Sequence, residues 1–251
     1  MTMLEVRDLT KTYKSLRAVD RLSFTIRPGE IVGLLGPNGA GKTSALRCAA
    51  GILRPTSGTI LINGYDLVHD QARAKQGLAF VPELPALYEL LTVKEHLRFV
   101  AMCFKKLDRY ESEWPRLLER YQLVEKQNAL VATLSKGMRQ KLAIACAFIH
   151  DANVLLFDEP IIGIDPAGVA EVRREMMRAR EEGCAILVST HLLDTAERLC
   201  DRVVILARGR KIAEGTMAEL RQWGGDERMS LEEVFLKLTA EQNESPLVFE
   251  L

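Results

Sequence analysis

The sequence has no excess of charge of either sign and no long hydrophobic run. Its 251 residues include 34 Lys and Arg and 34 Asp and Glu, so the formal net charge is zero. Nucleic-acid-binding surfaces usually produce a basic excess, and its absence argues against a nucleic-acid partner. No segment approaches the roughly 18 consecutive apolar residues of a membrane-spanning helix. We therefore expect this protein to act on a membrane only through other subunits.

The sequence also lacks paired cysteine motifs and a recognisable leader. Its five cysteines are scattered, with no Cys-x-x-Cys spacing that would indicate a zinc or redox site. This pattern is typical of reduced thiols in the cytosol. Charges at Glu5, Arg7 and Asp8 come too early for a signal peptide. These features predict a cytoplasmic protein, and the length suffices for one elaborated α/β domain or two small lobes.

The sequence does contain a glycine-rich segment, Gly36-Pro37-Asn38-Gly39-Ala40-Gly41-Lys42-Thr43. It follows the apolar run 31–35 and precedes a helical pattern at 45–50, which is the context of a P-loop. The amides of such a loop and of its helix N-terminus face phosphate oxygens. Lys42 is expected to reach the β- and γ-phosphates, and the Thr43 hydroxyl to bind Mg²⁺. Together with Ser44, the segment predicts a nucleoside triphosphate site.

Two carboxylates, Asp158 and Glu159, follow the apolar run 154–157. Ligands of open α/β sheets bind at the carboxyl ends of strands. Asp158 is expected to hold Mg²⁺, directly or through water, and Glu159 to polarise the attacking water. His191 is expected to close another buried strand, 187–191, and to donate a hydrogen bond to charge on the transferred group. The remaining histidines are interpreted as structural: His69, His96 and His150.

The distribution of apolar residues predicts an α/β fold with a P-loop NTPase core. Its sheet is expected to be mostly parallel, with an N-terminal antiparallel β patch and a helical insertion. Helical spacing extends from residue 92 to 150. Strands are predicted at 4–9, 22–26, 31–35, 58–64, 77–81, 154–157, 185–189 and 202–206.

From about residue 4 to 225 the chain resembles the nucleotide-binding subunit of ATP-binding cassette (ABC) transporters. The P-loop and the Asp-Glu pair correspond to the family's Walker A and Walker B motifs, and His191 to its switch histidine. The further counterparts are the adenine-stacking aromatic at Tyr13, the Q-loop at Val81-Pro82-Glu83, the LSGGQ signature at Leu134-Ser135-Lys136-Gly137-Met138-Arg139-Gln140 and the D-loop at Gly163-Ile164-Asp165-Pro166. Besides the single aromatic Tyr13, these are six motifs in the family's order, and they make a very specific match.

The resemblance implies an ATPase that works as a head-to-tail dimer, with each ATP between one subunit's P-loop and the other's signature. The signature opens a helix predicted to run to Ile149, so free amides would face a phosphate. Closure then requires the γ-phosphate, and hydrolysis weakens the dimer. The implied Mg²⁺ ligands are Thr43, Glu83 and Asp158. The signature residues that act on the partner's ATP are Ser135, Lys136, Gly137 and Met138.

Two positions depart from the family pattern. Glu83 stands where most members have glutamine; it still offers an oxygen to Mg²⁺ but changes the local charge. Lys136 and Met138 replace the usual Gly and Gln of the signature, while Ser135 and Gly137, the pair that faces phosphate, are retained. We therefore expect a working signature. These departures, with the segment 231–235, resemble the branch that serves ABC-2-type exporters.

The predicted domains are an ABC ATPase domain at 1–225, with its helical subdomain at about 84–150, and a C-terminal helix and tail at 226–251. The predicted function is to energise transport, with export favoured, through a separate membrane permease at the cytoplasmic face. A second ABC subunit, identical or different, completes the dimer.

The alternative is a soluble ABC ATPase that acts on nucleic acid or ribosomes. The single cassette, the neutral charge and the short interval of about ninety residues between Thr43 and Leu134 argue against it. A P-loop kinase or GTPase would leave the signature and His191 unexplained, and no Asn-Lys-x-Asp motif is present.

Overall fold

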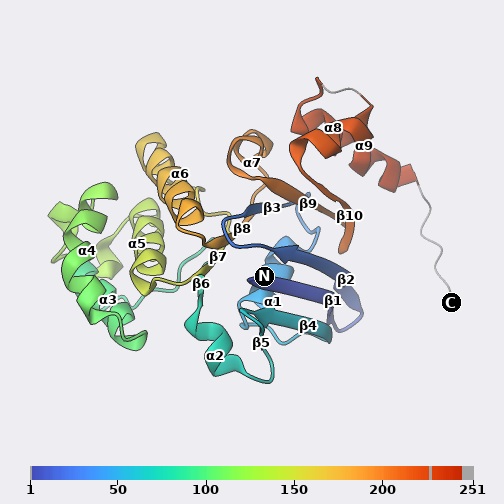
Figure 1. Cartoon of the computed structure of the whole chain (residues 1–251). Helices are drawn as coiled ribbons and strands as arrows, with labels where there is room; N and C mark the ends of the chain where they lie inside the picture. The colour runs from blue at the N-terminus through green and yellow to red at the C-terminus, as the bar shows by residue number, and fades with distance from the viewer. Residues whose placement is uncertain (1, 226–227, 245–251) are drawn as a thin grey trace.

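A computed structural model describes residues 2–225 and 228–244 and contains two sheets (Figure 1). The first is antiparallel, has the strand order β2-β1-β4-β5 and comprises Leu4–Tyr13 (β1), Leu16–Ile26 (β2), Ser57–Ile62 (β4) and Tyr65–Asp66 (β5). The second has the order β10-β9-β3-β8-β7-β6 and comprises Ile31–Leu35 (β3), Leu78–Val81 (β6), Val154–Asp158 (β7), Ala185–Ser189 (β8), Arg202–Ala207 (β9) and Arg210–Gly215 (β10).

The second sheet is parallel except for its edge strand β10, which pairs antiparallel with β9. Every residue of β3, β7 and β8 is buried, as expected of parallel strands covered on both faces. In the β7–β8 register Asp158 lies opposite Ser189. The carboxyl ends of these neighbouring strands therefore bring polar side chains together at one edge of the sheet.

The helical insertion forms an arm at one side of the sheets (Figure 1). It contains α3 (Val93–Cys103), α4 (Leu107–Arg120) and α5 (Lys136–His150), with short 3₁₀ turns at Val124–Lys126 and Val131–Thr133. Thr92 and Glu95 form a capping box that starts α3. Side chains from Gln140 to His150 are buried because α5 is packed between the arm and the sheet. The predicted fold, with P-loop core, antiparallel patch and helical insertion, is confirmed.

The other helices are α1 (Lys42–Ala49), α2 (Gln71–Gln76), α6 (Pro166–Glu181), α7 (Leu193–Leu199), α8 (Met217–Gly224) and α9 (Leu231–Glu244). Leu231 and Val234 fix α9 to the main core. The last seven residues of the predicted tail, 245–251, lie outside the described residues. Across the part of the chain that is described, no helix is long and apolar enough to cross a membrane.

Several strand predictions were too short, and the reason is local. β1 continues past residue 9 to Tyr13, because a register shift with Asp8 at φ 47° interrupts the alternation of buried side chains. The polar edge strand β10 was missed, since it has few apolar residues. β8 ends at Ser189, so the prediction that His191 belongs to this strand was wrong. His69 is exposed rather than structural, whereas His96 and His150 are buried.

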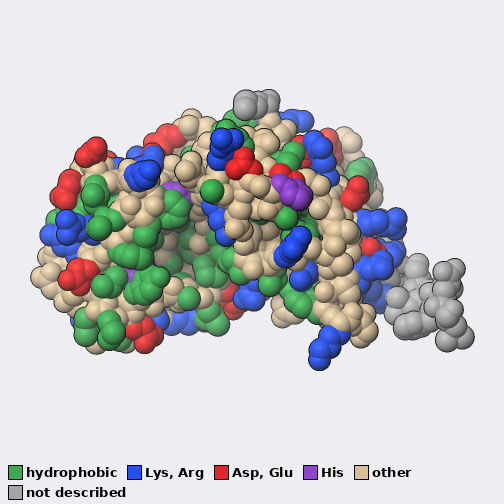
Figure 2. Space-filling view, turned by 90° about the horizontal axis from the view of Figure 1, so that it is seen from below, with side chains coloured by type: hydrophobic (Ala, Val, Ile, Leu, Met, Phe, Trp, Pro, Cys, Tyr) green, Lys and Arg blue, Asp and Glu red, His purple; other side chains and the backbone are tan. Residues whose placement is uncertain are grey.

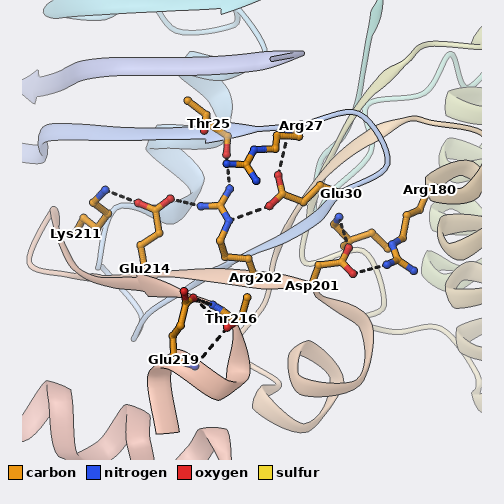
Figure 3. A network of polar contacts seen from close by, with 11 residues as sticks. Thr25, Arg27, Glu30, Arg180, Asp201, Arg202, Lys211, Glu214, Thr216 and Glu219 are labelled. Atoms are coloured by element: carbon orange, nitrogen blue, oxygen red, sulfur yellow. Dashed lines mark hydrogen bonds and ion pairs between the residues drawn. The ribbon is translucent and has the colours of Figure 1, made fainter. Parts of the chain in front are cut away.

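Arg202 ties the two sheets together at the edge opposite the carboxyl ends of the parallel strands (Figure 3). Its guanidinium donates to Glu30 at 2.9 Å, to the Thr25 carbonyl at 2.6 Å and to Glu214. Thr25 belongs to β2 of the antiparallel sheet, whereas Arg202 and Glu214 belong to β9 and β10. This network links β2 of the antiparallel sheet to the edge strands of the second sheet.

Candidate functional site

A cleft of about 440 Å³ opens where the P-loop meets the ends of both sheets. Its lining combines the loop itself with side chains from four other segments: Tyr13, Leu16, Ala18, Asn38–Ser44, Glu83, Glu159, Ile162 and His191. Gly41 shows why the loop must be glycine-rich. It has φ 103°, and a Cβ there would lie 2.2 Å from the carbonyl oxygen of Ala18 in β2. The loop can therefore pack directly on the antiparallel sheet.

Lys42 is folded back into the loop. Its Nζ donates to the carbonyls of Gly36 at 2.6 Å and Pro37 at 3.2 Å, and the side chain is buried. Burial lowers the pKa of Lys42, and the nearby charges of Glu159 and Asp158 act in the opposite direction. The loop thus holds a cation next to its free amides, an arrangement suited to phosphate oxygens.

Asp158 lies at the end of β7 beside Thr43. Its Oδ1 accepts from Ser189 Oγ at 2.6 Å and from Thr43 Oγ1 at 3.3 Å. No group of three or more His, Cys, Asp or Glu side chains suited to a metal occurs among residues 2–225 and 228–244. Mg²⁺ typically binds one or two carboxylates, with substrate phosphates and water completing its shell. The hydroxyl and carboxylate oxygens found here fit such an ion.

Glu159 is held in a strained backbone conformation, with φ 48°. Its N–H donates to the Ser189 carbonyl and hydroxyl, both at 3.2 Å. One carboxylate oxygen, Oε1, lies 2.9 Å from His191 Nδ1. The other, Oε2, is buried without a hydrogen-bond partner in the described structure. Because Glu159 lines the cleft, its carboxylate is placed to accept a hydrogen bond from a water molecule there.

Tyr13 and Leu16 supply the apolar end of the cleft. Tyr13 closes β1, is 40% exposed, and has its hydroxyl 3.4 Å from Ser44 Oγ. Lys11 Nζ lies 5.0 Å from the centroid of the ring. An exposed ring beside apolar side chains is suited to stacking with a flat heterocycle. Glu83, in the loop after β6, is exposed to the same cleft.

The predicted signature residues are not brought to this cleft. Ser135 to Met138 lie at the start of α5, where Ser135 Oγ caps the helix by accepting from the Met138 amide at 3.3 Å. Gly137 packs so tightly on the D-loop that a Cβ would lie 2.4 Å from the Gly163 carbonyl oxygen. Asp165 is likewise outside the cleft lining, as the N-cap of α6. Within one subunit, the signature and D-loop form a second, separate surface.

No functional role was predicted from the sequence for Ser189, Leu16, Ala18 or Ile162. Ser189 contacts both Asp158 and Glu159, and it is fully buried. A polar residue at the end of the apolar run 185–188 was the available signal, because it ends a strand next to the carboxylates. The other three line the cleft through folding of distant segments and have no local signature.

A family model described as "ABC transporter" matches residues 19–162. The chain is 38% identical over 242 residues to the ABC-type transporter ATP-binding protein EcsA of Bacillus subtilis, covering 96% of this chain and 98% of that protein. It is 39% identical to the Nod factor export ATP-binding protein I of Rhizobium meliloti, covering 84% of this chain and 64% of that protein.

Solved structures similar to this chain come from the same family. One described as an ATP-binding subunit of an ABC transporter is 39% identical, has a TM-score of 0.91, and covers 95% of this chain and 100% of that one. A dimeric bacterial ABC transporter cassette has a TM-score of 0.78 at 24% identity, covering 85% and 98%. The latter likeness concerns the fold alone.

Proposed function

Because the chain belongs to the ABC transporter family, we propose that it hydrolyses Mg·ATP in the P-loop cleft and so drives export through a separate permease. The chain is an ATP-hydrolysing subunit that energises an ABC transporter; such subunits act with membrane permeases and dimerise. The observation that carries the proposed mechanism is the Glu159 carboxylate, buried at the cleft with one oxygen unpartnered among the described residues.

The proposed chemistry assigns each polar group one task. The P-loop amides and Lys42 would bind the β- and γ-phosphates. Thr43 and Asp158, with Glu83, would hold Mg²⁺, which supplies positive charge to these phosphates. Glu159 would orient a water molecule for attack on the γ-phosphorus and take up its proton. His191, 2.9 Å from Glu159, would donate to the charge that develops on the transferred group.

The base would stack on Tyr13, beside Leu16. The nucleotide contacts proposed for one subunit are therefore Tyr13, Gly36, Pro37, Asn38, Gly39, Ala40, Gly41, Lys42, Thr43 and Ser44. The partner subunit, identical or different, would contribute Ser135, Lys136, Gly137 and Met138 to the γ-phosphate. The separation of the signature from its own cleft supports this division, because exposed Ser135 and Lys136 and half-buried Gly137 and Met138 otherwise have no phosphate to bind.

We propose that the permease docks on an apolar patch of the helical arm, formed by Leu84, Tyr88, Leu90, Phe99 and Met102. These side chains are between 37% and 87% exposed, and the Tyr88 and Phe99 rings pack edge to face at 5.0 Å. Figure 2 shows hydrophobic side chains gathered on the side of the molecule that the arm forms. Exposed apolar patches typically mark interaction sites. The subunit would then lie on the cytoplasmic face of the membrane.

Replacing Leu90 by aspartate is expected to impair this docking without harming catalysis. Leu90 is 87% exposed, so a charge there costs little folding stability but would be buried in the permease interface. ATP-driven transport in vesicles should fall at least roughly tenfold, while the isolated subunit hydrolyses ATP at its normal rate. Leu236→Asp, at another exposed leucine outside the patch, is the control. Normal transport by the Leu90 variant would contradict the proposal that the permease docks on this patch.

Replacing Glu83 by alanine tests whether the nucleotide cleft communicates with the permease. Glu83 lines the cleft and immediately precedes Leu84 of the apolar patch. It can therefore sense Mg·ATP and move with the docking surface. Glu83→Ala should reduce vesicle transport more than it reduces the basal ATPase rate of the isolated subunit. Equal losses in the two assays would mean that Glu83 acts in ATP hydrolysis and not in coupling to the permease.

A further inference from the structure

Three consecutive side chains near the start of α5 link this helix to three other functional segments: Arg139 and Gln140 at the end of the signature, and Lys141 directly after it. Arg139 pairs with Glu89 at 2.9 Å, next to Leu90 of the apolar patch. Gln140 Nε2 donates to the Pro82 carbonyl at 3.4 Å, next to Glu83. Lys141 Nζ lies 2.5 Å from Asp165 Oδ2 in the D-loop. Of the two ion pairs among these links, the one made by Lys141 has the more buried cation: the Lys141 side chain is 6% exposed, whereas that of Arg139 is 24% exposed.

Both oxygens of the Asp165 carboxylate are used within its own subunit. Oδ1 accepts from the Gly168 amide at 2.9 Å and caps α6, while Oδ2 accepts from Lys141. The Lys141 ammonium, followed by the Gly168 amide, holds the pKa of Asp165 below its usual value. The Lys141 side chain is only 6% exposed, whereas that of Asp165 is 49% exposed. Lys141 is thus a buried cation paired with a half-exposed carboxylate of the D-loop.

Two glycines make this arrangement possible. A Cβ on Gly168 would lie 2.6 Å from Lys141 Cε, so the lysine occupies the space that the side chain of a residue other than glycine would need at position 168. Gly137 of the signature packs against the Gly163 carbonyl of the D-loop, as described above. The start of α5 and the D-loop are therefore joined at two points: by backbone packing at Gly137, and by the ion pair between buried Lys141 and half-exposed Asp165.

We propose that Lys141 is a positioning residue that locks the D-loop to the signature, so that the two segments present one rigid surface to the partner subunit's ATP. This inference rests on the proposed function, because it presumes that the signature acts across the dimer. Lys141 touches no part of the cleft of its own subunit. Its removal should therefore leave nucleotide binding intact and slow the step that needs both subunits.

The test compares Lys141→Met, Asp165→Asn and the double variant in the full chain. Asparagine still caps α6, so Asp165→Asn removes only the charge. Each variant should bind a fluorescent ATP analogue with normal affinity, while kcat at saturating ATP falls roughly 10–100-fold. Asp165→Asn leaves a buried lysine unpaired and should lower the Tm; adding Lys141→Met should recover the Tm but not kcat. The two effects on kcat should not multiply, since both variants remove the same link.

Lys106→Met is the matched control, because Lys106 pairs with Asp151 at the opposite end of α5. It should leave kcat unchanged. A normal kcat in the double variant, weakened binding of the analogue, or an equal loss in the control would each overturn the role of Lys141.

A dimerisation assay distinguishes a failure of this proposal from a failure of the proposed function. Glu159→Gln should dimerise with Mg·ATP, and Glu159→Gln carrying Lys141→Met should dimerise weakly. If Glu159→Gln alone stays monomeric with Mg·ATP, the shared ATP site itself is contradicted. If Glu159→Gln dimerises equally well with and without Lys141→Met, only the Lys141 proposal is contradicted.

Discussion

Replacing Glu159 by glutamine is expected to reduce ATP turnover by roughly 10²–10⁴-fold, the usual contribution of a positioned general base. The physical reason is the placement of the carboxylate: Glu159 lines the cleft, its Oε1 is paired with His191, and its Oε2 is buried without a hydrogen-bond partner in the described structure. Glutamine retains the shape but cannot accept the proton of the attacking water. It also removes a negative charge beside the γ-phosphate, so ATP should bind at least as tightly.

Phosphate release and titration with a fluorescent ATP analogue measure the two effects separately. Glu175→Gln is a suitable control, because Glu175 is equally buried but lies on α6, away from the cleft lining. That variant should change stability and leave turnover per folded molecule unchanged. Normal turnover in Glu159→Gln would exclude Glu159 as the general base.

Replacing Lys42 by alanine should abolish ATP turnover and weaken nucleotide binding at least roughly 30-fold. Removing one partner of a buried charged pair typically costs about 2 kcal/mol or more of binding free energy, which corresponds to this factor. Lys42 is the buried cation of the P-loop, and its Nζ is already directed by the Gly36 and Pro37 carbonyls. Alanine would leave the phosphate charge less compensated. The loop itself should survive, because its conformation depends on the glycines.

Titration with the fluorescent analogue measures this loss. Lys75→Ala provides the comparison, since Lys75 Nζ also donates to a glycine carbonyl, that of Gly51, outside the nucleotide cleft. It should bind ATP normally. Unchanged affinity together with unchanged turnover in Lys42→Ala would contradict the assignment of the P-loop.

The sequence was informative wherever one short segment determines both structure and chemistry. The P-loop and the Asp158-Glu159 pair each follow a buried strand, so local pattern placed them at the carboxyl edge of the sheet. The resemblance to ABC proteins added Tyr13 and Glu83. Tyr13 ends β1 of the antiparallel sheet and Glu83 follows β6 of the second sheet, so the two meet only in the folded cleft. No periodicity in a single segment could have brought those two together.

The interactions that orient the site were much less predictable. Ser189 acts through its register opposite Asp158, and that register depends on how β7 and β8 pair. The φ of 48° at Glu159 and the link from Lys141 to Asp165 depend on contacts between segments far apart in the chain. Such contacts produce no recognisable pattern in the sequence. Gly168 is a partial exception, because a side chain at this position would collide with Lys141.

The most direct test of the shared ATP site is the molar mass of Glu159→Gln in solution, measured by light scattering with and without Mg·ATP. Blocked hydrolysis should trap the closed state, so the mass should double with Mg·ATP and remain that of one chain without nucleotide. Adding Ser135→Glu, which places a negative charge where the signature would meet the γ-phosphate, should prevent the doubling. A Glu159→Gln protein that binds Mg·ATP and stays monomeric would contradict the shared site.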